Sequence, residues 1–593
     1  MVKLILEGSN SSERLAGSTL AASRVRPALV VAVCSAAAAL LVRATLLWTM
    51  PFDGLYGQDA FYYQSATNTL IDTWTDPSRL ARWLTSWGAP PISVWPLGYH
   101  LQSALAALIL GRGPTSGQAV SLLAGTLTAA WTALLTLRIS HLGVMGPEER
   151  NAVPSNSGSL ATRYSLLATR YPVLPGALLA GLIIAVSALA VRSSVVVMAD
   201  MAGLQWATLG ALLALLYLDV GVRSAKLGLL TGVCIGLASL TRYIYPLLLL
   251  PVLGAVVLAW KRRGVGDSAG RLPLVGAMLA ILLPALLIFA PQVAHNFIHP
   301  MQSVLPSPVI ASWSPQHAWQ GSFDGPDGHL EYRWPMALFY LVLPLLSAHA
   351  VGLAFAPFLL LGLVWILRTP TQVAAVLVVG WWLCFAGFYS GNIYQADRFV
   401  LSFLPPLAVL AGLGLNRFIA FVLPGVRTGA SANPEPSRRF LMPGFLAIVA
   451  IPVLISLAGL VAALNSAVAD YLTLYTGKQD YLQAVHCVQD VASESRTGLP
   501  LLTFQITFAM RQYTTLDAHE LYAETPNSVD ALLNRSPANG AARGYLVLPL
   551  AGFETQWGHT QVGRTYQHLQ TAYQLDTLPC PGTSFTTFEI RSR

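Results

Sequence analysis

Long apolar stretches recur along most of the chain and alternate with short polar segments. Residues 28–48, 172–191, 272–290 and 441–464 are each long enough, as a helix, to cross a hydrocarbon layer about 30 Å thick. The remaining stretches of this kind are 116–138, 201–218, 227–241, 243–260, 345–367, 371–390 and 399–421. The pattern therefore predicts an all-α polytopic membrane domain over residues 28–464, with about eleven transmembrane helices.

The apolar stretch at residues 96–110 decides the topology, because it falls short of the usual spanning length of about 20 residues. If it lies at the membrane surface, the basic clusters near 138–170, 261–263 and 427–439 share one side with the basic tail 1–27. If it crosses, these clusters lie on the opposite side. We therefore predict juxtamembrane helices in the first external loop, a cytoplasmic N-terminal tail and an extracytoplasmic C-terminus, in a multi-pass protein of the cell (cytoplasmic) membrane.

After residue 464 the chain takes on the composition of a soluble domain. Helical and strand patterns alternate there, which predicts a small C-terminal α/β extracytoplasmic domain over residues 465–593. The expected helices are 479–493, 528–534 and 561–573, and the expected strands are 500–504, 545–550 and 584–590. The domain contains neither a phosphate-binding glycine loop nor a nucleophile elbow, so we assign it no chemistry.

Composition and charge support the membrane interpretation. The chain is 54% hydrophobic and only 10% charged, against about 25% charged residues in an ordinary soluble domain. A net charge of +8 also fits a nucleic-acid partner, but the Lys and Arg residues form short clusters between apolar stretches rather than one basic face. We therefore expect membrane lipid as a partner and no nucleic acid.

The five cysteines fall into two groups. Cys34, Cys234 and Cys384 lie in apolar stretches, whereas Cys487 and Cys580 lie in the C-terminal domain. Because an external domain can keep a disulfide, and these two are each other's only possible partners within it, we predict a Cys487–Cys580 bridge. The alternative is two unpaired buried thiols.

Acidic and aromatic residues cluster directly after the first predicted span. Asp53 and Asp59 lie there beside Tyr62 and Tyr63. By position alone, these carboxylates are better explained as solvated acids at the membrane surface.

Six segments, in chain order, resemble the motif series of the GT-C membrane glycosyltransferases, in the branch of the protein O-mannosyltransferases and the lipid A aminoarabinose transferase. They are 57–63 (GQDAFYY), 95–100 (WPLGYH), 192–200 (RSSVVVMAD), 241–246 (TRYIYP), 291–296 (PQVAHN) and 397–406 (DRFVLSFLPP). In the second segment Trp95 replaces one proline of the family pattern. The resemblance covers about residues 28–465 and lies in the order and common side of the motifs.

The resemblance implies a transferase that moves a sugar from a polyprenyl-phosphate donor to an unknown protein, lipid or glycan acceptor, without a cofactor. It implies Asp59 and Asp200 as catalytic residues, with Asp59 as the base and Asp200 orienting the acceptor or an arginine. It implies Arg242 and Arg398 as the donor phosphate-binding residues. The implied substrate-binding residues are Tyr62, Tyr63, His100, His295 and Asn296.

These residue types fit the chemistry. A polyprenyl-phosphate sugar carries its own leaving group, so a single carboxylate that accepts the acceptor's proton is sufficient for an inverting displacement. Glycosidases instead need two carboxylates. Fixed arginines would stabilise the leaving phosphate at the membrane surface. The alternative for both arginines is simple snorkelling to lipid headgroups.

Two other interpretations have some support. His295 and His299, with Asp324, Asp327 and Glu331 downstream, form a pattern that also occurs in metal sites, but we predict a hydrated loop covering the site and no metal. A transporter or flippase of a lipid-linked or small polar substrate would also have about a dozen helices. Transporters usually place ionisable groups near the membrane centre, whereas here they lie at the ends of spans. We therefore favour the transferase.

Overall fold

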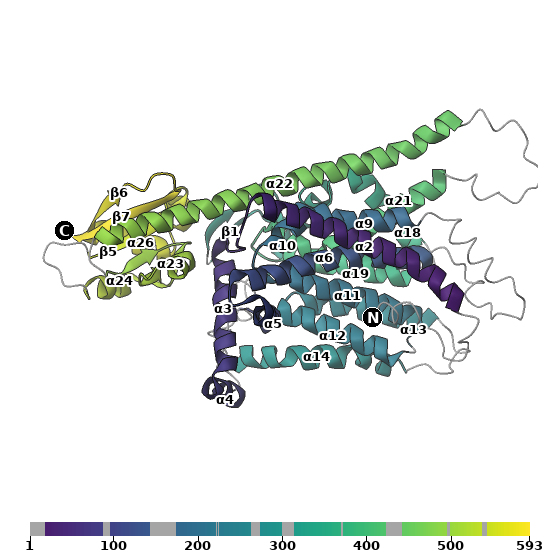
Figure 1. The fold of residues 1–593 in the computed structure, drawn as a ribbon, viewed down its shortest axis with the longest axis horizontal. Helices are drawn as coiled ribbons and strands as arrows, with labels where there is room; N and C mark the ends of the chain where they lie inside the picture. The colour runs from purple at the N-terminus through teal and green to yellow at the C-terminus, as the bar shows by residue number, and fades with distance from the viewer. Residues whose placement is uncertain are drawn as a thin grey trace, which may run out of the picture.

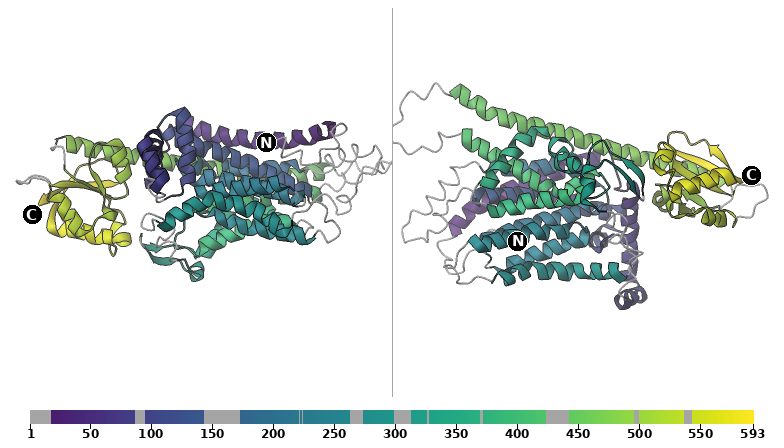
Figure 2. Two further views of the ribbon diagram at one scale, coloured as in Figure 1. Left: turned by 90° about the horizontal axis from the view of Figure 1, so that it is seen from below. Right: turned by 180° about the vertical axis from the view of Figure 1, so that it is seen from behind.

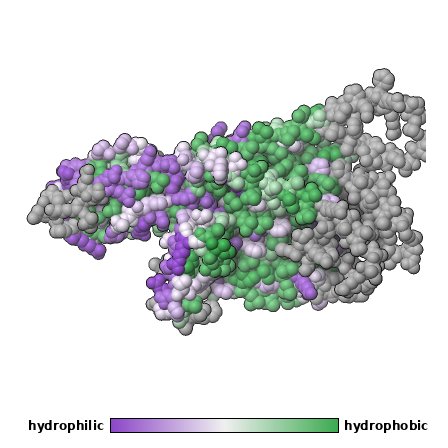
Figure 3. All heavy atoms as spheres, viewed as in Figure 1, coloured by the Kyte–Doolittle hydropathy of each residue, from purple (hydrophilic) through white to green (hydrophobic). Residues whose placement is uncertain are grey.

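The protein consists of a bundle of long helices, a helix that lies across one end of the bundle, and a separate α/β domain beyond that end (Figures 1 and 2). The computed structural model describes residues 18–86, 95–142, 173–220, 222, 224–262, 273–298, 313–325, 327–368, 372–422, 442–494, 499–535 and 543–593. Apolar side chains cover the visible face of the bundle, and polar ones cover the transverse helix and much of the α/β domain (Figure 3).

Within the described residues, every apolar stretch predicted to span the membrane contains a helix, although the predicted span 345–367 is interrupted between α17 (Leu343–Leu346) and η4 (Leu353–Phe355). Among the described residues, eight helices are long and apolar enough to cross a membrane, or nine if the bent pair α9–α10 is one span. The helices α12 and α18 are shorter. The bundle comprises α2 (Ser18–Thr49), α6 (Pro114–Leu142), α9 (Leu174–Val186), α10 (Ala188–Val195), α11 (Ala199–Asp219), α12 (Ala225–Thr241), η1 (Tyr245–Leu248), α13 (Leu249–Arg262), α14 (Leu274–Ile298), η4 (Leu353–Phe355), α18 (Ala356–Arg368), α19 (Gln372–Ser390), α20 (Asp397–Val400), η5 (Leu401–Phe403), α21 (Leu404–Val422) and α22 (Met442–Glu494). The predicted all-α polytopic architecture is confirmed.

The first loop between spans forms three helices. The transverse helix is α3 (Gly57–Thr75), followed by α4 (Pro77–Ser86) and α5 (Leu97–Leu110). Gly57 has a φ of +75°, a conformation that only glycine adopts easily, and it turns the chain into α3. A Cβ on Gly98 would lie 2.7 Å from the carbonyl oxygen of Leu240, so glycine allows α5 to approach the end of α12.

A break between the helices α9 and α10 lies just before the motif segment 192–200. The helices α9 and α10 meet at Ser187 with a bend of 53°. Arg43, from α2, is fully buried there and donates hydrogen bonds to the carbonyl oxygens of Ala185 (3.0 Å) and Ala39 (2.8 Å). Because a helix end leaves carbonyls without helical partners, this buried guanidinium has a structural explanation at the break.

A small hairpin lies at the end of the bundle that carries α3 (Figure 1). Its strands β1 (Ser322–Gly325) and β2 (Gly328–Glu331) pair antiparallel. The short helices η3 (Pro315–Trp319), α16 (Met336–Leu341) and α17 (Leu343–Leu346) flank it. Gln556 of α25 (Phe553–Trp557) donates a 3.0 Å hydrogen bond from Nε2 to the carbonyl oxygen of Asp327. The loop predicted to cover the site therefore contacts the C-terminal domain.

The helix α22 connects the two parts of the protein. It runs without a break for 53 residues, which corresponds to about 80 Å and far exceeds the bilayer core. The domain boundary predicted at residue 464 falls inside this helix. The last turns of α22 pack on the sheet of the C-terminal domain through Ala484, Val485 and Val488.

The C-terminal domain is a mixed five-stranded sheet with the strand order β4-β3-β5-β7-β6. Strand β3 is parallel to β4 and β5, and β7 is antiparallel to β5 and β6. Alternate residues of β5 serve two cores: Tyr545 and Val547 face α22, while Leu546 and Leu548 pack in the core with α24 and α26. The elements are β3 (Leu501–Thr503), α23 (Thr507–Tyr513), β4 (Ala518–Glu520), η8 (Leu521–Ala523), α24 (Pro526–Leu533), β5 (Gly544–Pro549), α25, α26 (Gln561–Ala572), β6 (Tyr573–Leu578) and β7 (Phe585–Ser592). The predicted α/β class is confirmed.

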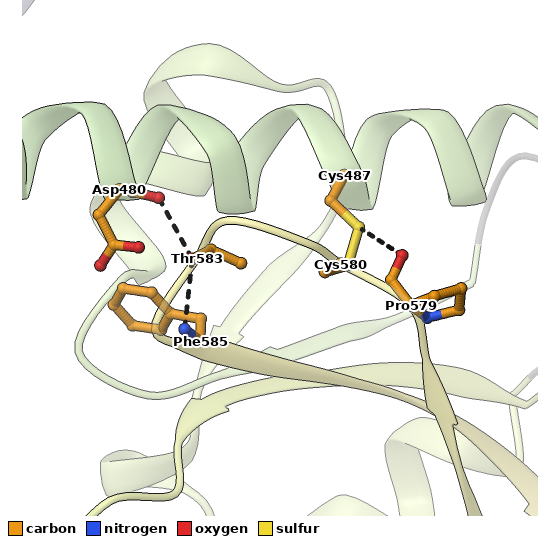
Figure 4. Close-up of a disulfide and its surroundings, with 6 residues drawn as sticks. All are labelled: Asp480, Cys487, Pro579, Cys580, Thr583 and Phe585. Atoms are coloured by element: carbon orange, nitrogen blue, oxygen red, sulfur yellow. Dashed lines mark hydrogen bonds between the residues drawn. A yellow bond between two sulfur atoms is a disulfide. The ribbon is translucent and has the colours of Figure 1, made fainter.

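A disulfide fastens this domain to α22. Cys487 of α22 bonds to Cys580, which lies between β6 and β7, with a Cα–Cα distance of 5.7 Å (Figure 4). Beside it, Asp480 accepts hydrogen bonds from the backbone N–H of Ser584 (2.7 Å) and, at its carbonyl, from the hydroxyl of Thr583 (3.3 Å). The predicted pairing is confirmed.

The bridge determines how many cysteines can be alkylated without a reductant. Under denaturing, non-reducing conditions we expect alkylation of Cys34, Cys234 and Cys384 only, counted by mass spectrometry. The bridge spans 93 residues, a loop for which the chain-entropy model gives a stabilisation of up to about 4–5 kcal/mol. Reduction should therefore lower the unfolding temperature of the C-terminal domain. Alkylation of all five cysteines without reductant would contradict the pairing.

Candidate active site

Two acid–arginine pairs meet at the end of the bundle that carries α3. Asp59 Oδ2 accepts a 2.6 Å hydrogen bond from Arg398 Nη1, and this pair joins α3 to α20. Asp200 of α11 forms an ion pair with Arg242, which follows α12. Both pairs consist of residues that the sequence predicted, and the pairing itself brings together four separate segments of the chain.

Helix ends explain why these charges are stable here. Asp59 and Asp200 lie in the first turns of α3 and α11, where the positive end of the helix dipole favours a carboxylate. Arg242 is the C-cap of α12, where the negative end favours a cation.

Tyr63 lies among all four charges. Its phenol interacts electrostatically with Asp59, Asp200, Arg242 and Arg398. Burial raises the pKa of Tyr63 well above its ordinary value of 10.0, so the phenol stays a neutral hydrogen-bonding group. The two pairs therefore belong to one site, with Tyr63 close to both.

The two pairs differ in exposure. The side chains of Asp59 and Arg398 are 32% and 38% exposed, whereas those of Asp200 and Arg242 are 5% and 16% exposed. A substrate can therefore reach Asp59 and Arg398 directly. Asp200 is placed to fix the orientation of Arg242.

A network of amide and phenol groups supports the Arg242 segment. Asn296 Nδ2 donates to the hydroxyl of Tyr243 (3.0 Å), and Gln292 Nε2 donates to the same hydroxyl (3.2 Å). Gln292 Oε1 accepts the backbone N–H of Leu97 at the start of α5 (3.0 Å). The end of α14 is thereby tied to the residue after Arg242 and to α5.

The other predicted substrate-binding residues differ in how deeply their side chains are buried. His100 is fully buried against Tyr63, with ring centroids 5.2 Å apart, and burial lowers the pKa of His100 to about 3, so its imidazole is neutral. His295 is also buried, one residue before Asn296 on α14. Tyr62 is half-buried and faces Phe508 of the C-terminal domain. Contact of these residues with a substrate stays a prediction.

The sequence interpretation missed Tyr389. This buried residue of α19 interacts electrostatically with Arg242, Asp200 and Arg398, and its ring stacks on Phe399 with centroids 4.7 Å apart. The available signal was its place at the end of an apolar stretch, eight positions before Asp397, which opens the last motif.

The structure offers no alternative metal centre within the residues it describes. No three His, Cys, Asp or Glu side chains of this part of the chain are grouped so that they hold a metal ion. His299, which the sequence pattern included, lies outside the described residues.

Comparison with known proteins gives likeness in structure only. No family model and no curated protein matches the chain. The chain is similar to the archaeal oligosaccharyltransferase AglB from Archaeoglobus fulgidus, solved in complex with an inhibitory peptide and a dolichol-phosphate. The identity is 13% and the TM-score 0.51, over 95% of this chain and 74% of that chain.

A second similar structure is ArnT from Cupriavidus metallidurans bound to undecaprenyl phosphate. It is 14% identical, with a TM-score of 0.49, over 94% of this chain and 97% of that chain. The AglB likeness, which includes nearly the whole chain, is the one that establishes the architecture. The protein described here therefore has the fold of the GT-C membrane glycosyltransferases.

Proposed function

We propose that this protein is a glycosyltransferase that moves a sugar from a polyprenyl-phosphate donor to an acceptor. The observation that carries the proposal is the convergence of two acid–arginine pairs around Tyr63, at one end of a helix bundle with the GT-C fold. AglB, which shares this fold, was solved with dolichol-phosphate, and this supports the donor class.

Asp59 is the proposed base, because it is the more exposed of the two carboxylates. It removes the proton from the acceptor's nucleophilic atom as that atom bonds to the anomeric carbon of the sugar. The bond between that carbon and the phosphate oxygen breaks, and its electron pair leaves with the polyprenyl phosphate. A single displacement of this kind inverts the anomeric configuration.

The arginines are proposed to hold the phosphate. Arg398 has a partly exposed side chain whose guanidinium pairs with Asp59 in the structure, and a phosphate oxygen can compete for the same guanidinium. When the phosphate takes Arg398, Asp59 is freed to accept a proton. Arg242, held by Asp200, supplies a second fixed positive charge for the leaving group. Tyr62, Tyr63, His100, His295 and Asn296 are proposed to contact or support the sugar and the acceptor.

Reconstitution in liposomes tests this function against transport. The purified protein is supplied with a radiolabelled polyprenyl-phosphate sugar and a pool of protein, lipid and glycan acceptors. We expect the label to appear in an acceptor and free polyprenyl phosphate to form. Movement of intact donor across the bilayer without release of polyprenyl phosphate would instead establish the transporter or flippase alternative.

The proposal includes a topology that fusions can check. The start of α2 and the C-terminal domain lie at opposite ends of the bundle. A reporter fused after residue 439 should therefore report the cytoplasm, and one fused after Arg593 the extracytoplasmic side. The positive-inside rule gives this orientation. Signals from a single side of the membrane would contradict it.

A further inference from the structure

The C-terminal domain holds the residue that directly precedes the proposed base. Gln58 Nε2 donates a 3.0 Å hydrogen bond to Glu520 Oε2, and Gln58 Oε1 accepts a 3.2 Å hydrogen bond from the backbone N–H of Phe508. The amide nitrogen and the amide oxygen of the Gln58 side chain are therefore both hydrogen-bonded to the C-terminal domain. The hydroxyl of Thr507 also donates to Glu520 Oε2, which fixes the carboxylate for this role.

A second contact holds the loop that leads into α3. Lys478 Nζ lies 3.1 Å from Asp53 Oδ2, and the hydroxyl of Tyr513 donates to the same oxygen at 2.9 Å. The Lys478 side chain is only 6% exposed and lies over the rings of Phe61 (5.1 Å) and Tyr513 (4.5 Å). A buried ammonium with one carboxylate and two rings around it is a specific, desolvated contact.

Aromatic contacts extend this junction along α3. Tyr62 meets Phe508 with ring centroids 6.0 Å apart, and Phe61 meets Tyr513 at 5.8 Å. The segment from Asp53 to Tyr62 is therefore fixed by the C-terminal domain and the end of α22 on both sides of Asp59. Asp59 itself pairs with Arg398 of the bundle.

We propose that the C-terminal domain positions Asp59 for the reaction, with Glu520 and Lys478 as positioning residues that act through Gln58 and Asp53. This inference rests on the proposed function of Asp59. The four residues Lys478, Phe508, Tyr513 and Glu520 are here called the clamp residues. Once the donor phosphate takes Arg398 and frees Asp59, the contacts of the clamp residues with Asp53 and Gln58 still hold the neighbouring segment. Loss of the clamp therefore displaces the base relative to the bundle-bound donor.

Glu520 variants test the kinetic consequence in the full-length protein. We expect Glu520→Ala to lower kcat by about ten- to a hundredfold while the KM of the donor stays within about twofold, because a misplaced base affects the step and not phosphate binding. Glu520→Gln keeps an oxygen that accepts from Gln58, and we expect it to recover most of the activity. Glu589→Gln is the matched control, since Glu589, whose side chain is 14% exposed, forms an ion pair with the half-exposed Arg591 in the same domain.

Gln58→Ala leaves the C-terminal domain unaltered and gives a second, independent variant. Glu520 and Gln58 act through one contact, so the Gln58→Ala/Glu520→Ala double variant should be no slower than the slower single variant. Fully multiplicative losses would overturn the positioning role.

Hydrogen–deuterium exchange tests the contact without any activity. Glu520→Ala and Gln58→Ala should each raise amide exchange over residues 57–63 by about tenfold, and Glu589→Gln should leave it unchanged. If wild-type protein transfers no sugar, the proposed function fails. The exchange result alone then decides whether the clamp residues hold residues 57–63. Unchanged exchange in both variants, or unchanged kcat in both, would overturn the inference.

Discussion

Asp59→Asn should abolish sugar transfer while leaving the protein folded and able to bind the donor. The amide has nearly the same shape and can still accept a hydrogen bond from Arg398 through its oxygen, but it cannot take the acceptor's proton. Loss of a general base costs about 10² to 10⁴ in rate. The measurement is kcat with a polyprenyl-phosphate sugar in proteoliposomes, together with the thermal unfolding temperature.

The control for this variant lies on the same helix. Asp72 of α3 forms an exposed ion pair with Arg112, and its side chain is 46% exposed. Asp72→Asn should keep wild-type kcat, because a surface pair of this kind contributes little to stability. Activity of Asp59→Asn within a few-fold of wild type would remove Asp59 as the base.

Neutralising the arginines should weaken use of the donor. Arg398→Gln removes the exposed cation proposed to hold the phosphate, and we expect kcat/KM for the donor to fall by about a hundredfold or more. Arg242 requires a double variant, because removing it alone would leave Asp200 as an uncompensated buried charge. Arg242→Gln combined with Asp200→Asn removes both charges, and a comparable fall in kcat/KM is expected.

Arg112→Gln provides the comparison for both arginine variants. The Arg112 side chain is 53% exposed, so this variant removes an exposed cation from the same end of the protein. If snorkelling to headgroups explains Arg398, its replacement will have an effect as small as that of Arg112→Gln. An unchanged apparent donor affinity in both the Arg398 and Arg242 variants would therefore contradict the phosphate site.

Much of the architecture follows from the sequence because the bilayer imposes a simple rule. A segment that crosses must satisfy its backbone within a helix, so apolar length alone locates the spans, including the short α12. The same rule says nothing about breaks inside a span. The bend at Ser187 and the Arg43 side chain that satisfies it depend on contacts between α2 and α9, which no local pattern contains.

The site was predicted as residues but not as pairs. Each motif is local, so the sequence could indicate Asp59, Asp200, Arg242 and Arg398 individually. Which acid meets which arginine depends on how α3, α11, α12 and α20 converge, over separations of 42 and 339 residues. Packing of helices far apart in sequence sets these pairs.

The same reason explains why the clamp residues were not predicted. Lys478 lies directly before the first helix expected in the C-terminal domain, and Glu520 lies in a three-residue strand. Neither position has a distinctive local pattern. Their partners, Asp53 and Gln58, are more than 400 residues earlier in the chain. Only the tertiary structure brings them together.

The position of a bound lipid phosphate tests the central claim most directly. An experimental structure of the protein in a lipid nanodisc with polyprenyl phosphate should place phosphate oxygens about 2.7–2.9 Å from guanidinium nitrogens of Arg398 and Arg242. Asp59 should then be released from Arg398 and face the position of the anomeric carbon. A phosphate bound elsewhere, with both the Asp59–Arg398 and Asp200–Arg242 pairs intact, would contradict the account.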